Sequence, residues 1–254
     1  MARELRRVLI QPERLNADGV LLLSPEEQRY LSKVLRYGPG DQFAVINGCG
    51  DLWTAELLTP QQARLLEPQG APLERHPEPR PSLVLAAAVV KRDFDVVIRM
   101  AVELGVDRFI PLLSQRTAVQ GQLRLDRWRS IAAEAAEQCE RLWLPRLDPP
   151  MTLPDLLEAS QLRGAEAAPA FWATTRSSAD LPSLSAAVAE LPDCPSAVYL
   201  ACGPEGGWSP EEDQWAEAAG WRPVDLGPRI LRSSTACVAA LSALSSWRAS
   251  RWDI

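Results

Sequence analysis

The spacing of apolar residues changes near residue 82 and predicts a different kind of structure on each side. Before this point, short apolar runs predict strands at 42–46, 52–58 and 63–67, with a hairpin turn at 47–50. Ser24 and the Pro-Glu-Glu that follows it are typical of a helix start, and this helix should run to about residue 36. Short strands around one helix indicate a small β-barrel module.

After residue 82, continuous apolar runs alternate with amphipathic stretches. We expect buried strands at 83–90, 106–113, 169–175 and 196–202, and a short strand at 222–226. We expect helices at about 93–104, 126–141, 210–220 and 235–248, with Gly105 just beyond the end of the first. This alternation predicts an α/β domain with a mostly parallel sheet, whose ligands lie beyond the carboxyl ends of the strands.

The stretch 68–81 separates the two patterns and carries five prolines, as is typical of a linker. The predicted organisation is therefore an N-terminal domain over 1–72, a linker over 73–81 and a second domain over 82–254. His76, the single histidine of the chain, lies in this linker, and we expect it to be solvated. Its position disfavours a Ser-His-Asp triad, and one histidine excludes a histidine-rich zinc site, so we expect no metal.

Composition narrows the class of protein further. The net charge of −6 argues weakly against nucleic acid, but the acidity is concentrated in residues 148–221, and the flanking 91–146 and 222–254 are both net basic. Of 27 basic residues 25 are arginine, which suits phosphate contacts, although a GC-rich genome explains this total at least as well. The chain has no 18-residue apolar run and no signal-peptide pattern, so we expect no membrane span. The odd, widely separated cysteines (Cys49, Cys139, Cys194, Cys202 and Cys237) indicate reduced thiols in a cytoplasmic protein.

The glycine-rich stretch CGPEGGWSP (202–210) follows a predicted buried strand and opens a helix. It matches neither a phosphate-binding P-loop nor a dinucleotide fingerprint. Its one charge is Glu205, and Pro204 removes an amide donor, so a polyphosphate is a poor ligand for it. A ligand read by backbone groups, such as an adenosine, would be tolerated. On these residues alone, a tight turn without any ligand is an equally good interpretation.

Two further stretches place polar residues near helices. LGPRILRSSTACVAAL (226–241) puts Arg229 and Arg232 at a helix N-terminus, which favours an anion, with a residue of 233–235 as the cap. Glu134, Gln138 and Arg141 share one face of the helix at 126–141. The alternatives are two surface arginines and a solvated helix face.

Together these stretches resemble the SPOUT methyltransferases, which carry a trefoil knot. The similarity is greatest to the bacterial ribosomal-RNA uridine-N3 methyltransferases, the RsmE family. GPEGGWSPEE and LGPRILRSSTA carry it, together with VLRYGPGD (34–41), AVELGVDRFIPLLSQRT (101–117) and EAAEQCERLWLP (134–145). These segments follow the family's order over about residues 30–241.

The resemblance implies a PUA-like β-barrel, a knotted α/β domain and a homodimer. It also implies S-adenosylmethionine-dependent methylation of uridine N3 in 16S ribosomal RNA. Matching by position assigns the cofactor pocket to Leu200, Gly203, Gly207, Leu226, Gly227, Ile230 and Leu231. It assigns catalysis to Arg232 and Arg229 and RNA contacts to Arg36, Arg116 and Arg141.

The chain departs from the family pattern at three positions. Ser234 stands where a glutamate is usual, Glu140 where glycine is common and Met100 where lysine is common. If the missing glutamate assists deprotonation or orients the cofactor, activity is affected. Two alternative functions therefore stay open: a knotted methyltransferase acting on another RNA target, such as a ribose hydroxyl, and a non-catalytic RNA-binding or ribosome-assembly protein.

Overall fold

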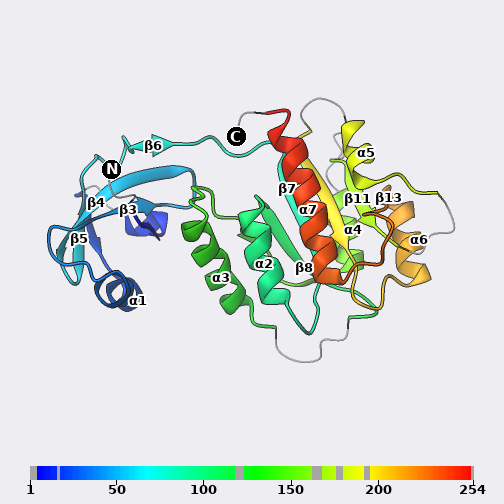
Figure 1. The fold of residues 1–254 in the computed structure, drawn as a ribbon, viewed down its shortest axis with the longest axis horizontal. Coiled ribbons are helices and arrows are strands. Elements are labelled where there is room, and N and C mark those ends of the chain that lie inside the picture. The colour runs from blue at the N-terminus through cyan, green and yellow to red at the C-terminus, as the bar shows by residue number, and fades with distance from the viewer. Residues whose placement is uncertain are drawn as a thin grey trace. The chain divides into compact units, whose positions relative to one another are not determined.

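The computed structural model describes residues 5–15, 18–117, 123–161, 168–175, 180–191 and 195–252. The chain packs into two compact units (Figure 1). The N-terminal unit contains residues 1–78 and 133–144, and the C-terminal unit contains residues 79–132 and 145–254. Residues 133–144 therefore pack with the N-terminal unit, although they follow a part of the other unit in sequence.

The N-terminal unit is built on a six-stranded sheet with the order β1-β3-β4-β5-β2 and with β6 paired to β4. Its strands are β1 (Arg7–Leu9), β2 (Val20–Leu22), β3 (Gln42–Ile46), β4 (Asp51–Thr59), β5 (Gln62–Leu65) and β6 (Glu74–Arg75). The three strands predicted from the sequence are confirmed as β3, β4 and β5. The other three have two or three residues each, too few to show a period of two.

Local sequence explains the turn and the helix of this unit. The Asn47 side chain accepts hydrogen bonds from the amides of Cys49 (2.8 Å) and Asp51 (3.1 Å), which closes the predicted hairpin between β3 and β4. Ser24 caps α1 (Pro25–Arg29) in a capping box with Glu27, as predicted. The helix then widens into a π-helical turn (Tyr30–Val34), and a 3₁₀ turn (Pro12–Arg14) lies between β1 and β2.

The proline-rich stretch is partly structured. β6 forms within it because Glu74 and Arg75 pair with β4, and Arg75 Nε donates to Asp51 Oδ1 at 2.6 Å. The His76 amide donates to the Gly50 carbonyl, while the His76 side chain is 59% exposed, as predicted. The pairing with β4 depends on residues more than twenty positions away, which proline content does not reveal.

The end of α3 (Leu125–Gln138) belongs to the N-terminal unit. There the carboxylate of Glu137 accepts a hydrogen bond from the Leu9 amide of β1 at 2.6 Å. Burial raises the pKa of Glu137 above its ordinary value. Glu134 and Gln138, which we singled out on this helix, are both exposed. The residue of the helix that binds the sheet is therefore Glu137, which neither the charge pattern nor the alanine-rich context distinguished.

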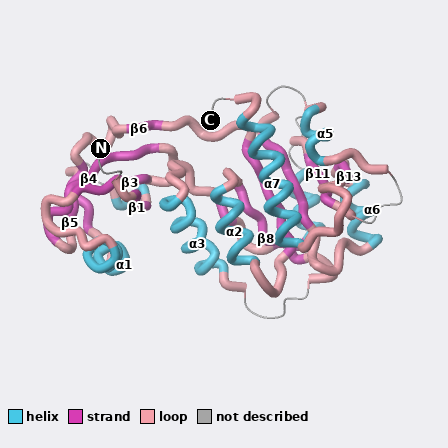
Figure 2. The backbone as a smooth tube through the Cα atoms, viewed as in Figure 1, coloured by secondary structure: helices cyan, strands magenta, loops and turns pink. Residues whose placement is uncertain are grey.

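The C-terminal unit contains a seven-stranded, entirely parallel sheet with the order β10-β8-β7-β12-β11-β13 and with β9 paired to β8. Its strands are β7 (Ser82–Ala88), β8 (Arg108–Leu113), β9 (Arg146–Leu147), β10 (Met151–Thr152), β11 (Ala170–Ala173), β12 (Ala197–Cys202) and β13 (Arg222–Val224). Three of these strands, β8, β11 and β13, are labelled in Figure 2. The predicted parallel α/β architecture is confirmed. The two-residue strands β9 and β10 were not predicted.

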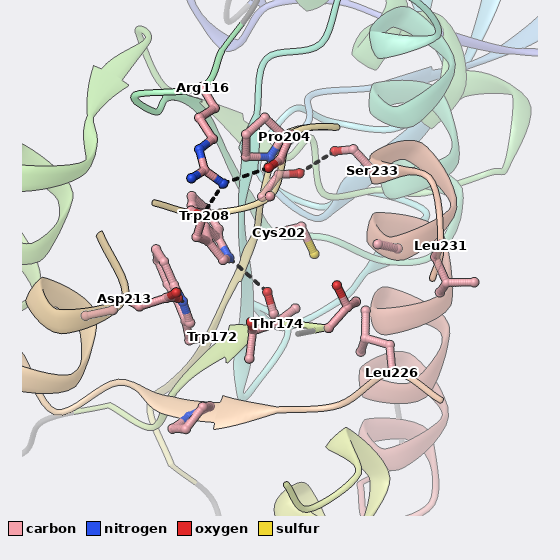
Figure 3. A pocket seen from close by; sticks show the side chains of 18 of the residues that line it. Arg116, Trp172, Thr174, Cys202, Pro204, Trp208, Asp213, Leu226, Leu231 and Ser233 are labelled. Carbon is pink, nitrogen blue, oxygen red and sulfur yellow. Dashed lines mark hydrogen bonds between the residues drawn. The ribbon is translucent and has the colours of Figure 1, made fainter. Parts of the chain in front are cut away.

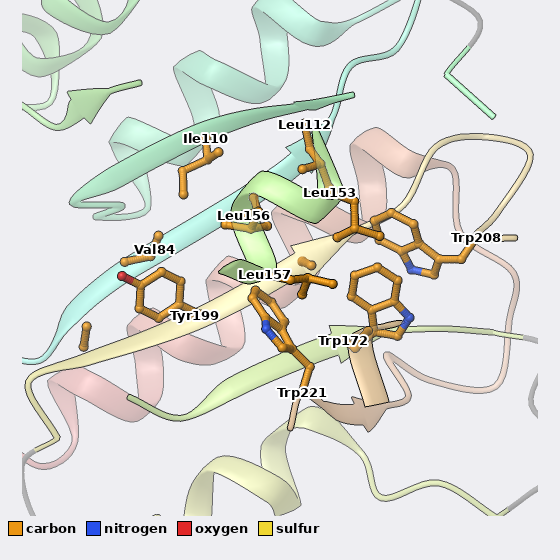
Figure 4. Close-up of a cluster of buried hydrophobic side chains, with 14 residues drawn as sticks. Val84, Ile110, Leu112, Leu153, Leu156, Leu157, Trp172, Tyr199, Trp208 and Trp221 are labelled. Carbon is orange, nitrogen blue, oxygen red and sulfur yellow. The ribbon is translucent and has the colours of Figure 1, made fainter. Parts of the chain in front are cut away.

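Helices cover both faces of this sheet. They are α2 (Phe94–Glu103), α4 (Leu153–Gln161), α5 (Leu184–Ala189), α6 (Pro210–Ala218) and α7 (Ser233–Ala249). Tyr199 and Ala201 of β12 join the cluster under α4 and α6 (Figure 4), whereas Cys202 lies against Cys237 of α7. Successive residues of β12 thus point to opposite faces, and both faces are buried, as the continuous apolar run predicted.

The far end of α7 is anchored by a buried cation. Arg248 is 3% exposed, and its guanidinium donates to the Asp107 carboxylate (2.5 Å) and to the carbonyls of Gly105 (2.8 Å) and Pro81 (3.2 Å). Gly105, predicted to follow α2, has φ +84° and closes the helix. These bonds fix α7 along β7 and therefore fix where its first turn lies.

Two expectations from composition concern the cysteines and membrane-spanning helices. Cys49, Cys139, Cys202 and Cys237 are free thiols, and Cys194 lies outside the described residues. Among the described helices, none is long and apolar enough to cross a membrane.

Candidate functional site

A cavity of about 450 Å³ lies in the C-terminal unit where β11 and β12 end (Figure 3). Two segments form its walls: the loop 203–209, which follows β12, and the segment 225–232, which connects β13 to α7. We call these the first loop and the second loop. The carboxyl edge of a parallel sheet is where the sequence predicted a ligand, and the volume is within the range of about 300–1,000 Å³ typical of small-molecule sites.

The first loop is held by its own residues. Gly207 has φ +68°, and its amide donates to the Pro204 carbonyl at 2.9 Å, which forms the turn. Trp208 Nε1 donates to the Ala173 carbonyl at 2.9 Å, and the Trp208 ring stacks on Trp172 with 3.8 Å between centroids. A Cβ on Gly203 would lie 2.9 Å from the Trp208 ring, so only glycine fits there. The loop ends in a capping box of Ser209 and Glu212.

The loop that follows β8 also holds the first loop in place through hydrogen bonds. Arg116, which follows β8, donates from one guanidinium nitrogen to the carbonyls of Gly206 (2.9 Å) and Trp208 (2.8 Å). The neighbouring Gln115 amide donates to the buried carboxylate of Glu212 at 2.8 Å. We assigned Arg116 to RNA contacts from the sequence. Its bonds to the first loop give it a positioning role in the pocket wall, and a contact with RNA stays a prediction.

The second loop is held by fewer contacts. The Gly227 amide donates to Asp225 Oδ1 at 2.6 Å, and Gly227 has φ +123°. Arg229 and Ile230 are exposed, and Ile230 is 70% exposed although it lines the cavity. The loop leads into α7 without a side-chain cap, because Arg232 occupies the N-cap position.

This helix start corrects one expectation. We predicted that Ser233, Ser234 or Thr235 would cap the helix, but Ser233 is its first residue and is buried. Its hydroxyl donates to the Gly203 carbonyl at 2.6 Å, across the cavity wall (Figure 3). The serine therefore joins the start of α7 to the first loop instead of closing its own helix.

The structure brings most of the predicted cofactor residues together. Gly203, Gly207, Leu226, Ile230 and Leu231 all line the cavity. Leu200 does not, because it lies within β12 and is fully buried there, and Gly227 also lies outside the lining.

The predicted arginines are dispersed. Arg229 does not line the cavity, and Arg232 lines a neighbouring hollow. Arg36 and Arg141 belong to the N-terminal unit, where Arg36 is exposed with φ +60°. Residues of both predicted loops thus line the cavity, whereas the direction of each long side chain depended on packing.

Several lining residues were not predicted. The floor of the cavity carries Trp172, Trp221 and Thr174, and α6 contributes Asp213 and Glu217. Trp172 Nε1 donates to Asp213 Oδ1 at 2.8 Å. A signal for Thr174 was present, since it lies at the carboxyl end of a strand predicted over 169–175, and the rule that placed the glycine loop at a carboxyl end applies equally to it. The acidic residues of α6 carried no such signal.

The charges of the cavity suit a cationic ligand. Glu205, Asp213 and Glu217 line it, while the one lining cation among the described residues, Arg116, is bonded to loop carbonyls. A hydrogen bond with Cys237, together with burial, raises the pKa of Cys202 well above its ordinary value. The Cys202 thiol therefore lines the cavity as an uncharged group. A polyphosphate would meet three carboxylates here, whereas a positively charged nucleoside would find apolar surface, backbone groups and compensating charge.

Comparison with known proteins agrees with this geometry. Residues 76–245 match the RNA methyltransferase domain family, and residues 23–65 match the RNA methyltransferase PUA domain family. The ribosomal RNA small subunit methyltransferase E of Synechocystis is 37% identical over 94% of this chain and 77% of its own length.

Solved structures also resemble nearly all of the chain, and two of them contain S-adenosylmethionine. One is a putative methyltransferase from Legionella pneumophila in complex with S-adenosylmethionine (30% identity, 96% of this chain and 98% of that one, TM-score 0.80). The other is a ribosomal RNA small subunit methyltransferase E from Neisseria gonorrhoeae bound to S-adenosylmethionine (28% identity, 96% and 98%, TM-score 0.78). With both of its domains matched in order and a glycine-walled pocket at the sheet edge, this chain belongs to the ribosomal RNA small subunit methyltransferase E family.

Proposed function

We propose that this protein transfers a methyl group from S-adenosylmethionine to N3 of a uridine in 16S ribosomal RNA of the small subunit. The observation that carries the proposal is the cavity between the first and second loops, which has carboxylates, apolar surface and no cation left for a phosphate among its described lining residues. S-adenosylmethionine is a cationic adenosine derivative without phosphates, and these residues fit it.

The residues that would hold the cofactor are those of the two loops. The backbone of 203–207 and the apolar side chains of Leu226 and Leu231 would contact the cofactor. Asp213 and Glu217 would balance the positive charge of its sulfonium. When bound, S-adenosylmethionine supplies a methyl group activated by a sulfonium. The protein's part is to exclude water from this group, to hold the base in line with it and to accept the N3 proton. We propose that Arg229 and Arg232 hold the phosphate or the uracil oxygens.

The decisive experiment is a methylation assay on naked 16S RNA and on small subunits that lack the modification. Mass spectrometry of the digested RNA then locates the modified atom. We expect N3-methyluridine at a single position. A methyl group on a ribose hydroxyl would replace this proposal with a different knotted methyltransferase, and binding of RNA without binding of S-adenosylmethionine in calorimetry would support a non-catalytic protein.

Three further properties belong to the proposal through the family resemblance: a trefoil knot in the C-terminal unit, a homodimer and a cytoplasmic location. The dimer is tested by sedimentation velocity at micromolar concentration, where we expect one species of twice the 28.0 kDa chain mass. A species with the mass of one chain across this concentration range would refute it.

A further inference from the structure

A second hollow, of about 470 Å³, adjoins the cofactor pocket within the C-terminal unit, and three cations line it. Lys91 and Arg92 come from the segment after β7, and Arg232 immediately precedes α7. Within the described part of the chain, none of the three has a carboxylate at ion-pair distance. Cations left without such partners in a concave surface are suited to bind phosphate oxygens or a base that has lost a proton.

Two residues line both this hollow and the cofactor pocket, namely Glu205 and Ser233. The Ser233 hydroxyl already donates to the Gly203 carbonyl. Glu205 is exposed, and its carboxylate has no hydrogen-bond or ion-pair partner among the described residues. Glu205 therefore places a free proton acceptor at the boundary between the two spaces.

We propose that this second hollow seats the target uridylate and that Glu205 accepts the proton from N3 of its uracil. This inference rests on the proposed function and assigns its substrate site. A base that enters from the hollow meets the methyl group of a cofactor in the adjoining pocket only at their shared wall, where Glu205 lies. Lys91, Arg92 and Arg232 bind the phosphate and the uracil oxygens and stabilise the anionic base.

The step balances without any further reactant. The N3–H bond breaks, and the proton passes to a carboxylate oxygen of Glu205. The electron pair left on N3 forms the new bond to the methyl carbon. The bond from that carbon to sulfur breaks, its electron pair stays on sulfur, and the sulfonium becomes a neutral thioether.

Charged groups face Glu205 from both spaces. In the second hollow they are Lys91, Arg92, Asp93 and Arg232. In the cofactor pocket they are Arg116, Asp213 and Glu217. Glu158, an exposed residue of α4, lines neither space, so its carboxylate provides a matched control for Glu205.

The first test is the pH dependence of single-turnover methylation by Glu205→Gln. We expect the rate at neutral pH to fall about 100-fold, as is typical when a general base is lost. We also expect the remaining rate to increase tenfold per pH unit, because only uracil that has already lost its proton reacts. The wild type should instead reach a plateau, because the protein's own base then removes the proton. Glu158→Gln should keep the plateau, and the assay is run at saturating S-adenosylmethionine so that weaker cofactor binding by Glu205→Gln does not lower the rate.

The second test measures binding without catalysis. Uridine 5′-monophosphate is titrated by NMR into the full chain in the presence of S-adenosylhomocysteine. We expect the double variant Lys91→Met, Arg92→Met to weaken its binding at least tenfold. Arg99→Met, which removes an exposed cation of α2 that lies outside the hollow, should change the binding less than twofold.

The outcomes separate this inference from the proposed function. If the wild type methylates N3 but Glu205→Gln keeps both the rate and the plateau, Glu205 is not the acceptor. If the double variant binds uridine 5′-monophosphate as the wild type does, the hollow is not the substrate site. If the wild type forms no N3-methyluridine, the proposed function fails, while the binding titration still decides whether a uridylate occupies the hollow.

Discussion

The two loops that enclose the cofactor pocket are built in opposite ways. The first loop is bonded to three other parts of the unit: Arg116 after β8, Ala173 at the end of β11 and Ser233 at the start of α7. Among the described residues, the second loop has one side-chain hydrogen bond, from the Gly227 amide to Asp225, besides the backbone bonds that join Asp225 to Pro182 and Leu184. It exposes Arg229 and Ile230.

This difference indicates that the first loop is fixed before the ligand binds, whereas the second loop adjusts to the ligand. A wall that is fixed before the ligand arrives spares the complex the entropy of ordering it, and the glycines of the first loop allow the ligand to approach the backbone. A wall with few contacts can adjust to the ligand at little cost. Variants of the first loop should therefore change folding stability and affinity together, and variants of the second loop should change affinity alone.

The largest effect is expected from Gly203→Ala. The added Cβ would lie 2.9 Å from the Trp208 ring, which cannot move freely because it is stacked on Trp172 and bonded to the Ala173 carbonyl. Overpacking of this kind costs about 1–3 kcal/mol. We expect calorimetry to show a melting temperature lower by about 3–10 °C and binding of S-adenosylmethionine too weak to detect.

Gly206→Ala is the matched control for this variant. A Cβ at Gly206 would lie 3.4 Å from Cβ of Arg116, which is close to ordinary contact. We expect its melting temperature to fall by less than half as much as that of Gly203→Ala. Equal losses for the two variants would show that the first loop does not depend on the fit of Gly203 against Trp208.

The next effect is expected from Arg116→Met, which keeps the apolar stem and removes both hydrogen bonds to the first loop. Because the side chain is exposed, we expect a loss of about 1 kcal/mol in unfolding free energy and a roughly fivefold weaker binding of S-adenosylmethionine. Chemical denaturation and calorimetry measure the two quantities. Arg229→Met makes the same change in the second loop and should leave the unfolding free energy unaltered. If Arg229→Met destabilises the protein as much, the two loops do not differ as argued.

A smaller effect is expected from Ser233→Ala, which removes the hydroxyl that donates to the Gly203 carbonyl. One such bond contributes about 1 kcal/mol, which corresponds to about 2–4 °C in melting temperature. Ser234→Ala, one position along α7, removes a hydroxyl without a partner among the described residues and should change the melting temperature by less than 1 °C. Thermal melts of both variants followed by circular dichroism test this, and identical curves would contradict a role for Ser233 in joining α7 to the first loop.

The same contrast explains how far the sequence could predict this site. The glycines and the capping serine of the first loop act through local geometry, so their positions were visible in CGPEGGWSP. The helices α2, α3, α6 and α7 and the strands β7, β8, β11, β12 and β13 were also predicted, because each carries its own periodic pattern, whereas α4 and α5 were not predicted. The partners of the first loop lie far from it in the sequence, and no local pattern reveals that Arg116 points to this loop.

The differences between prediction and structure have the same origin. Ser233 was taken for a helix cap because serine is typical there, yet the tertiary bond to Gly203 determined its position. Leu200 was assigned to the pocket by motif position, but the strand around it is buried on both faces. β6 and residues 133–144 join the N-terminal unit through pairings that depend on distant segments, so a division of the chain by proline content could not include them.

The smallest effect on folding is expected from Ile230→Ala. This variant also tests most directly whether the second loop contacts the ligand. Ile230 is 70% exposed, so its truncation should change the unfolding free energy by less than about 0.5 kcal/mol. It nevertheless lines the cofactor pocket, and a ligand that covers it would bury apolar surface worth about 1 kcal/mol, or roughly fivefold in affinity. Leu22→Ala removes a side chain of similar size and exposure (68%) from the N-terminal unit and should change neither quantity. Quenching of the pocket tryptophans by S-adenosylmethionine measures the affinity. If Ile230→Ala binds as tightly as Leu22→Ala, the second loop does not close on the ligand, and the first loop alone accounts for recognition.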